Sequence, residues 1–383
     1  MEHLSEVLKI LEGALRHDPS GAREYALLLA DKLEDERRAR QAEALRRTIA
    51  RMPGLAVQST EAAAALPRDD ESDTPTVDIE QPLENNRPLA LPRFVRQQLD
   101  EFVQTVEKRD LWVEHGIDTP ARLLLVGLPG TGKTQTAREV ARNLGLPIVM
   151  TRSDVLVSSF LGQTSKNIRR VFEYASSRPC VLFLDELDAI AKRRDDSQEV
   201  GELQRVVIAL LQNLDALPES TVVLAATNHP ELLDRAIGRR FAFHIDIPLP
   251  AAAQRAQIWA DRLGSHAPPP EDIDILASVS EGMSGAVIEA AALDARRQGV
   301  ILGHDVAPLT LILRRLARML WYEDHQVFES PEAEMIALRR WLPKVFTYRE
   351  LSEQFDVTTR QVGNAVRSRT EARADSLGAH ETQ

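Results

Sequence analysis

An apolar run that leads directly into a glycine-rich loop constrains this chain more than any other feature. Leu123–Val126 is followed by the loop 127–134, Gly-Leu-Pro-Gly-Thr-Gly-Lys-Thr, which fits the pattern G-x-x-x-x-G-K-[ST]. In such a loop the glycines let backbone N–H groups curl around phosphate oxygens, Lys133 neutralises the outer phosphates, and the Thr134 hydroxyl can bind Mg²⁺. Because a strand, the loop and a helix follow one another as this chemistry requires, we favour a phosphate site over an accidental glycine turn.

Four further apolar runs predict the other strands of a sheet. They are Ile148–Met150, Val181–Leu184, Val222–Ala225 and Phe243–Ile247, with helical patterns between them. The runs are nearly continuous rather than alternating, as strands that are buried on both faces of a parallel sheet require. The sequence therefore predicts an α/β fold in which helices cover both faces of a parallel sheet of five strands.

Changes of composition divide the chain into five segments. Residues 1–52 have apolar residues at helical spacing and predict a small helical bundle, or one helical hairpin that pairs with a partner. Residues 53–90 hold five prolines and eight acidic residues against two arginines, and they predict a flexible acidic linker. Residues 91–250 carry the α/β pattern, 251–320 predict a helical lid, and 321–383 a helical carboxy-terminal module.

Composition also limits the class of function. The net charge of −11 at pH 7 disfavours a protein whose whole surface coats nucleic acid. No uncharged apolar run is long enough to span a membrane, and the amino terminus has neither a basic nor an apolar leader region. Cys180 is the only cysteine, so neither an internal disulfide nor a cysteine metal cluster can form. We therefore expect a cytoplasmic protein without a membrane span.

Two acidic residues stand where a doubly wound sheet presents its ligands. Asp185 and Glu186 directly follow the run Val181–Leu184. Asp185 can hold the water shell of Mg²⁺, and Glu186 is placed to orient and deprotonate an attacking water. Acidic residues also favour the start of a helix, which is the structural alternative. Since a phosphate loop precedes them, we interpret the pair as catalytic, and the glutamate indicates hydrolysis rather than transfer to a small acceptor.

Polar residues after later strands extend the predicted site. Asn228 can hydrogen-bond the γ-phosphate or the attacking water, and a polar turn is the alternative interpretation. Arg239 and Arg240 lie just before a strand, either in an ordinary solvated turn or as a pair that reaches the γ-phosphate of another subunit. No Asn-Lys-x-Asp motif for guanine is present, so ATP is preferred to GTP.

The order of these motifs resembles the AAA family of AAA+ ATPases. The phosphate loop, the box Leu-Asp-Glu-Leu-Asp-Ala-Ile at 184–190, Ala-Ala-Thr-Asn-His-Pro at 225–230 and Asp-Arg-Ala-Ile-Gly-Arg-Arg-Phe at 234–241 match the family in order and spacing. The resemblance covers about residues 91–300. Within the family the chain most resembles the microtubule-severing and ESCRT-disassembly branch, which is katanin- and spastin-like, because that branch shares the Arg-Arg-Phe ending.

The resemblance implies a residue for each part of an ATP site, with Gly116 and Ile117 beside the adenine. The nucleotide contacts that it implies are Gly116, Ile117, Pro129, Gly130, Thr131, Gly132, Lys133, Thr134, Gln135, Gly285 and Ala286. The metal ligands are Thr134 and Asp185, and the catalytic residues are Glu186, the sensor Asn228 and the trans fingers Arg239 and Arg240. It also implies ATP and Mg²⁺, and a homo-oligomeric ring that is a hexamer in the ATP state.

A short aromatic loop bears on the substrate. Phe160, Leu161 and Gly162 follow the second strand, where the family carries the loop of its central pore. The alternative is a helix whose last turn buries Phe160 and ends at a glycine cap. A ring of such aromatic side chains grips an extended polypeptide, so the resemblance implies a protein substrate.

The carboxy-terminal segment departs from the family. Residues 343–368 contain two capping boxes, Thr347 with Glu350 and Thr358 with Gln361, and resemble a winged-helix module. Six basic and six acidic residues lie in 343–383, which is a weak charge pattern for DNA.

Three functions are compatible with these patterns. The first is an ATP-driven ring that remodels, unfolds or translocates a protein. The second is a nucleotide-dependent assembly switch that activates a partner enzyme, such as a protease docked through residues 1–52. The third is a DNA-associated regulator. Phe160–Gly162 favours the first, and the neutral carboxy terminus disfavours the third.

Overall fold

The chain forms two compact units, Met1–Leu249 and Pro250–Gln383. The computed structural model describes residues 6–7, 10, 19–35, 38–50, 66–69, 73–82, 89–117, 119–151, 163–190, 200–218, 220–323 and 330–367. Across those ranges no helix combines the length and the apolar character that crossing a membrane requires.

A six-stranded sheet organises the first unit. In chain order its strands are β1 (Val77–Glu80), β2 (Arg122–Val126), β3 (Ile148–Thr151), β4 (Val181–Leu184), β5 (Val222–Thr227) and β6 (Phe243–Asp246). The spatial order is β1-β3-β4-β5-β2-β6, and all pairs except β1–β3 are parallel. The five parallel strands are those that the apolar runs predict, so the α/β prediction is confirmed.

The edge strand β1 is absent from the sequence-based prediction. It pairs antiparallel with β3, so that Val77 lies opposite Thr151. The prediction of a flexible linker over 53–90 is therefore wrong at residues 77–80. The strand has only four residues and stands in an acidic, proline-rich stretch, which hides it. Its last residue, Glu80, accepts two hydrogen bonds from the Arg138 guanidinium, at 2.7 and 2.9 Å.

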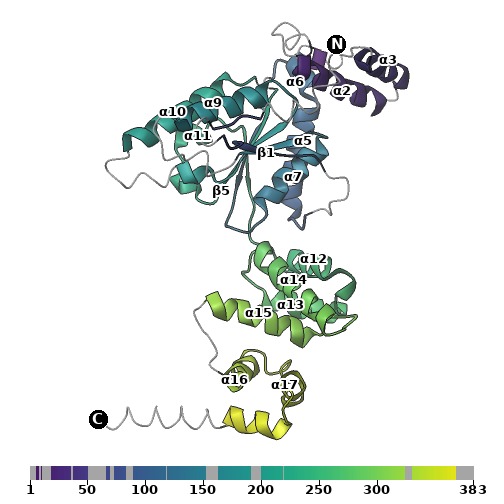
Figure 1. Cartoon of the computed structure of the whole chain (residues 1–383), viewed down its shortest axis with the longest axis vertical. Coiled ribbons are helices and arrows are strands. Elements are labelled where there is room, and N and C mark those ends of the chain that lie inside the picture. Colours follow the sequence, from purple (N-terminus) through teal and green to yellow (C-terminus); the bar gives the residue numbers. More distant parts are fainter. Residues whose placement is uncertain are drawn as a thin grey trace. The chain divides into compact units, whose positions relative to one another are not determined.

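Helices cover both faces of this sheet, as Figure 1 shows. Within the described ranges, the α-helices of the α/β part are α5 (Arg93–Glu107), α6 (Arg109–Glu114), α7 (Lys133–Asn143), α9 (Gln163–Ser176), α10 (Val200–Ala216) and α11 (Arg235–Gly238). Neighbouring residues of one strand point to opposite faces: Phe183 packs with α5 and α7, whereas Leu182 and Leu184 pack with α9 and α10. Because each strand is covered on both sides, its residues are apolar without alternation.

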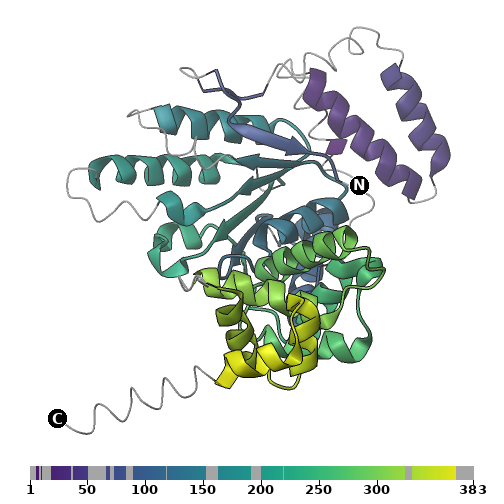
Figure 2. The same cartoon turned by 60° about the horizontal axis from the view of Figure 1, so that its bottom comes forward.

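Two of the described helices, α2 (Pro19–Asp35) and α3 (Ala39–Ala50), come before the sheet in the chain. They lie side by side, as Figure 2 shows. Arg46 of α3 forms ion pairs with Asp31 and Glu34 of α2, at 2.6 and 2.5 Å. Most of residues 1–18, which form the first part of the predicted bundle, lies outside the described residues.

The second unit is helical, and one core joins its parts. Its helices are α12 (Ala252–Leu263), α13 (Pro270–Val279), α14 (Gly285–Ile301), α15 (Leu309–Glu323), α16 (Pro331–Trp341) and α17 (Tyr348–Phe355), and residues 359–367 are also helical. Trp259 of α12 belongs to the same buried cluster as Phe346, Leu351 and Val362. Helix α15 continues through residue 320, so the predicted boundary between lid and carboxy-terminal module falls inside a helix.

Hydrogen bonds at both predicted capping boxes are present. Thr347 Oγ1 accepts the N–H of Glu350 at 3.2 Å, and Thr358 Oγ1 accepts the N–H of Gln361 at 3.3 Å. Gln361 Oε1 accepts the N–H of Thr358 in return, at 2.8 Å. The polar side chains therefore fix where both helices of this segment begin.

Candidate active site

Glycines shape the loop between β2 and α7. Gly130 and Gly132 have φ angles of 76° and 101°, which side chains with a Cβ rarely adopt, and Gly132 caps the start of α7. A Cβ on Gly127 would come within 2.4 Å of the Ile247 carbonyl oxygen. The loop conformation thus depends on glycine at 127 and 132, which the motif specifies, and also at 130, which it leaves open.

Lys133 is the buried cation of the site. It is the first residue of α7, and only 7% of its surface is exposed. Its Nζ donates to the carbonyl oxygens of Gly127 and Leu128 at 2.7 and 3.0 Å, and to Asn228 Oδ1 at 2.6 Å. Burial lowers the pKa of Lys133, although the charges of Asp185 and Asp188 act in the opposite direction. The site therefore holds a positive charge that its surroundings do not fully compensate.

The two acidic residues after β4 have different environments. Asp185 Oδ2 accepts the Thr134 hydroxyl at 2.9 Å, which brings together the two predicted metal ligands. Glu186 is exposed, and its φ of 51° is a conformation that costs energy for any residue with a side chain. The N–H of Glu186 donates to Asp185 Oδ1 at 2.9 Å, which helps to hold this turn.

The oxygens of Thr134 and Asp185 fit Mg²⁺. Magnesium at phosphate sites takes one or two protein oxygens and completes its shell with water and phosphate. Among the described residues no three His, Cys, Asp or Glu side chains gather as a metal cage. A hydroxyl and a carboxylate 2.9 Å apart could therefore supply the protein ligands of a Mg²⁺ that a phosphate ligand would otherwise hold.

Asn228 lies where the sequence predicts it, at the end of β5, and reaches Lys133 from the neighbouring strand. Its backbone N–H donates to Asp188 Oδ1 at 3.2 Å. Asp188, of which 3% is exposed, was given no role by the sequence interpretation. The sequence feature that could have indicated it is its position three residues after Asp185. The turn Leu187–Ile190, on which Asp188 lies, is a 3₁₀ helix with three residues per turn.

The two predicted arginine fingers differ. Arg240 donates from Nε and Nη2 to the two carboxylate oxygens of Asp215 on α10, both at 3.0 Å. The hydrogen bonds and charge of Asp215 raise the pKa of Arg240. The Arg239 side chain is exposed, and within the part of the chain that the structure describes it has no ion pair. Sequence adjacency did not distinguish a paired arginine from an exposed one.

Other predicted contacts are spread over both units. Pro129, Thr131 and Gln135 belong to the loop and the first turn of α7, and Thr131 Oγ1 donates to the Leu128 carbonyl at 2.9 Å. Gly116, with φ 72°, and Ile117, which is 48% exposed, follow α6. The remaining predictions are Gly285 and Ala286 at the start of α14 in the second unit, and Phe160, Leu161 and Gly162, which lie outside the described residues.

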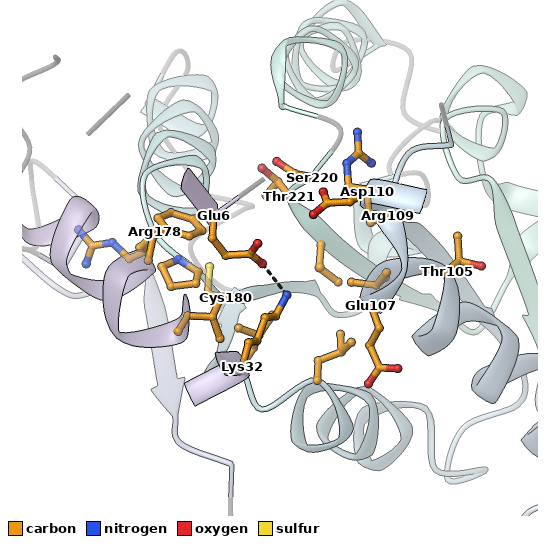
Figure 3. Close-up of a pocket in the computed structure, with 18 of the residues that line it drawn as sticks. Glu6, Lys32, Thr105, Glu107, Arg109, Asp110, Arg178, Cys180, Ser220 and Thr221 are labelled. Carbon is orange, nitrogen blue, oxygen red and sulfur yellow. Dashed lines mark hydrogen bonds and ion pairs between the residues drawn. The ribbon is translucent and has the colours of Figure 1, made fainter. Parts of the chain in front are cut away.

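A cavity of about 310 Å³ lies at the opposite, amino-terminal edge of the sheet (Figure 3). It is lined by α2, by α5 and α6, and by residues just before β2, β4 and β5. Lys32 and Glu6 form an ion pair there. Burial raises the pKa of the Cys180 thiol in its wall to about 12, so this thiol is protonated at neutral pH. The cavity shares no lining residue with the phosphate loop.

The region that holds this site matches the model of a known protein family. The model of the ATPase family associated with various cellular activities (AAA) matches residues 123–249. That span contains the phosphate loop, the acidic pair, Asn228 and both arginines.

Curated relatives match over a similar region. An uncharacterized AAA family ATPase, y4kL, of Sinorhizobium fredii is 37% identical over 219 residues, which are 57% of this chain and 66% of that protein. Proteasome-activating nucleotidase of Aeropyrum pernix is 33% identical over 241 residues, 60% of this chain and 58% of that protein. ATP-dependent zinc metalloprotease FtsH of Acidothermus cellulolyticus is 35% identical over 218 residues, 54% of this chain and 33% of that protein. The chain thus spans between a third and two thirds of the length of these relatives.

Proposed function

The chain carries an ATPase domain of the AAA family, and we propose that this domain hydrolyses ATP with Mg²⁺ to act on a protein substrate. The proposal rests chiefly on one observation: at one edge of the sheet, Lys133 hydrogen-bonds Asn228 while its neighbour Thr134 hydrogen-bonds Asp185. These residues come from α7, the turn after β4 and the end of β5, so a nucleotide phosphate group would meet all of them at once.

Each side chain of this edge has a separate task in the proposed reaction. Lys133 binds the outer phosphates, and the γ-phosphate would take the place of the Asn228 oxygen or share the lysine with it. Bound Mg²⁺ would offset the negative charge that develops on the phosphate oxygens. Glu186 would accept the proton of the attacking water, since its carboxylate is exposed and its backbone is held by Asp185.

Replacement of Glu186 by glutamine tests the hydrolytic assignment. Glu186→Gln keeps the size and the oxygen of the side chain but removes the base, so ATP turnover should fall at least about 100-fold while ATP binding is kept. Glu173→Gln is the matched control, because Glu173 is an exposed acid on α9 in an ion pair with Arg169. Undiminished turnover in Glu186→Gln would overturn the assignment.

The arginines are proposed to act on the ATP of a neighbouring subunit in a homo-oligomeric ring, a hexamer in the ATP state. Arg239 supports this proposal because its side chain is exposed. Arg239→Ala should therefore abolish hydrolysis and leave ATP binding to each subunit intact. Mixing Arg239→Ala protein with Lys133→Ala protein should restore part of the activity in mixed rings. If mixed rings form and remain inactive, the arginine does not act in trans.

A protein substrate is favoured by the names of two relatives, since a proteasome-activating nucleotidase and an ATP-dependent metalloprotease both link ATP to proteolysis. A partner protease, docked through residues 1–52, is compatible with the same comparison. The likeness to the severing branch remains a prediction that rests on the Arg-Arg-Phe ending.

Phe160→Ala separates a motor that grips its substrate from an assembly switch. If Phe160 lines a pore, the variant should keep its melting temperature and basal turnover and lose substrate-stimulated turnover. If Phe160 is instead buried, the substitution should cost roughly 3–5 kcal/mol of stability. A stable variant with full remodelling activity would favour the switch.

A further inference from the structure

Asp188 stands at the centre of a buried hydrogen-bond cluster behind the proposed site. Its Oδ1 accepts the Thr227 hydroxyl at 3.1 Å and the backbone N–H of Asn228 at 3.2 Å. The Thr227 oxygen in turn accepts the N–H of His229 at 3.1 Å. One carboxylate oxygen is therefore tied, directly or through Thr227, to three consecutive residues at the end of β5.

This cluster sets where Asn228 stands. Thr227 is fully buried, so the carboxylate that receives its hydroxyl is enclosed by protein on that side. The turn that Asp188 holds is the one from which the Asn228 amide reaches Lys133, at 2.6 Å from oxygen to nitrogen. Because Asn228 is the residue directly bonded through its backbone, a shift of that bond moves its side chain with it.

Asp188 also connects the two strand ends of the site. It lies on the 3₁₀ turn that begins directly after Asp185 and Glu186, whereas its partners lie on β5. A carboxylate that bridges these two turns keeps the distance between the proposed base and the proposed sensor constant. An error of about 1 Å in such a distance can cost on the order of 100-fold in rate.

We propose that Asp188 is a positioning residue, which acts on ATP hydrolysis through Asn228 and makes no contact with the nucleotide itself. This inference rests on the ATP hydrolysis proposed above. The competing explanation is that Asp188 is a buried carboxylate that only stabilises the fold. The two explanations differ in whether removal of Asp188 still matters once the Asn228 amide is gone.

A double-mutant cycle with the full-length protein distinguishes them. Asp188→Ala and Asn228→Ala should each lower kcat about 10- to 100-fold and leave the KM for ATP nearly unchanged. The double variant should be no slower than Asn228→Ala alone, because the positioned group is already absent. Multiplicative effects, or a loss in Asp188→Ala that appears chiefly in KM, would overturn the proposal.

Two further variants distinguish a loss of positioning from a loss of folding. Asp188→Asn keeps an oxygen that can accept both hydrogen bonds, so it should retain most of the turnover. If it is as slow as Asp188→Ala, positioning through these bonds is wrong. Asp69→Ala is the matched control, since Asp69 is also a buried carboxylate, hydrogen-bonded to Asn167 at 2.7 Å and separate from the phosphate loop. It should lose stability and keep kcat.

The same assay keeps the inference apart from the proposed function. If the wild-type protein turns over ATP and the effects of the two substitutions on kcat multiply, only the proposed role of Asp188 is wrong. If the wild-type protein binds no ATP and shows no turnover, both the proposed function and the proposed role of Asp188 are wrong.

Discussion

Two buried charged side chains, one in each unit, have opposite surroundings. Lys133 in the first unit is 7% exposed and Glu334 in the second unit is 5% exposed. Lys133 donates to two carbonyl oxygens and one amide oxygen, all of them uncharged. Glu334 accepts four hydrogen bonds from two guanidinium groups, those of Arg314 and Arg318, at 2.7 to 3.0 Å.

The pKa values of the two groups record this difference. Burial lowers the pKa of Lys133, so its surroundings disfavour the charged form. Burial alone would raise the pKa of Glu334, but the hydrogen bonds from Arg314 and Arg318 outweigh it and lower that pKa to about 2. A buried charge that is paired with opposite charges of the protein stabilises the fold. A buried cation that lacks such a partner can instead bind an anion from outside the protein.

The largest effect is expected from Glu334→Ala. The substitution leaves Arg314 and Arg318 without the carboxylate that they share, and breaking a buried pair in this way typically costs about 3–5 kcal/mol. Urea unfolding followed by tryptophan fluorescence measures this loss, because Trp259, Trp321 and Trp341 all lie in the second unit. An unchanged unfolding midpoint would show that the cluster adds nothing to stability.

Low pH should remove the stabilisation that the Glu334 carboxylate contributes. The pKa of Glu334 is about 2 in the folded protein and near 4.5 when unfolded, so its contribution is present above pH 4.5 and disappears as the pH falls toward 2. The shift corresponds to roughly 3 kcal/mol at most. The unfolding free energy of the wild type should decline through this window, and that of Glu334→Gln should decline less. Parallel curves would contradict the assignment.

Lys133→Met should weaken ATP binding and leave stability intact, which is the reverse of what we expect for Glu334→Ala. It removes the cation that would bind the phosphates, and a charge-assisted hydrogen bond of about 1.5–3 kcal/mol corresponds to roughly a 10- to 100-fold loss of ATP affinity. Since the folded state disfavours this charge, the unfolding free energy should stay equal or rise. Fluorescent ATP titration measures the affinity, with Lys108→Met, an exposed lysine, as the control. A large loss of stability would place Lys133 with the structural charges.

The smallest effect is expected at the surface. Arg349 and Glu353 form an ion pair on α17 at 3.0 Å, but both side chains are mostly exposed. Water and salt screen such a pair, so Arg349→Ala should leave the unfolding midpoint unchanged within error. A shift as large as that of Glu334→Ala would mean that pairing rather than burial decides the contribution.

The two clusters were not equally predictable from the sequence. Lys133, Thr134, Asp185 and Asn228 follow apolar strands at motif spacing, and parallel strands bring their carboxyl ends to one edge. Glu334 meets Arg314 across 20 residues and two helices, and no periodicity links them. A pair of this kind depends on how α15 and α16 pack, which helix patterns alone leave open.

The other features that the sequence did not predict, strand β1 and the role of Asp188, have similar physical reasons. Strand β1 has four residues, and contacts with other elements hold it: its pairing with β3, the burial of Val77 in the core, and the ion pair of Glu80 with Arg138. Asp188 lies in the box at 184–190, but the box does not reveal its role, because that role depends on a hydrogen bond to the end of the next strand. Contacts between elements, rather than composition within them, supply what the sequence interpretation lacked.

Melting curves of the full chain with and without Mg·ATP test the central claim most directly. Ligand at 100 times its Kd stabilises a folded protein by about 2.7 kcal/mol, so ATP should raise the melting temperature of the wild type. Glu334→Gln should melt lower than the wild type and still gain from ATP, whereas Lys133→Met should melt as high as the wild type and gain little. An equal gain in Lys133→Met and the wild type would contradict the account that the uncompensated charge at the phosphate loop binds ATP.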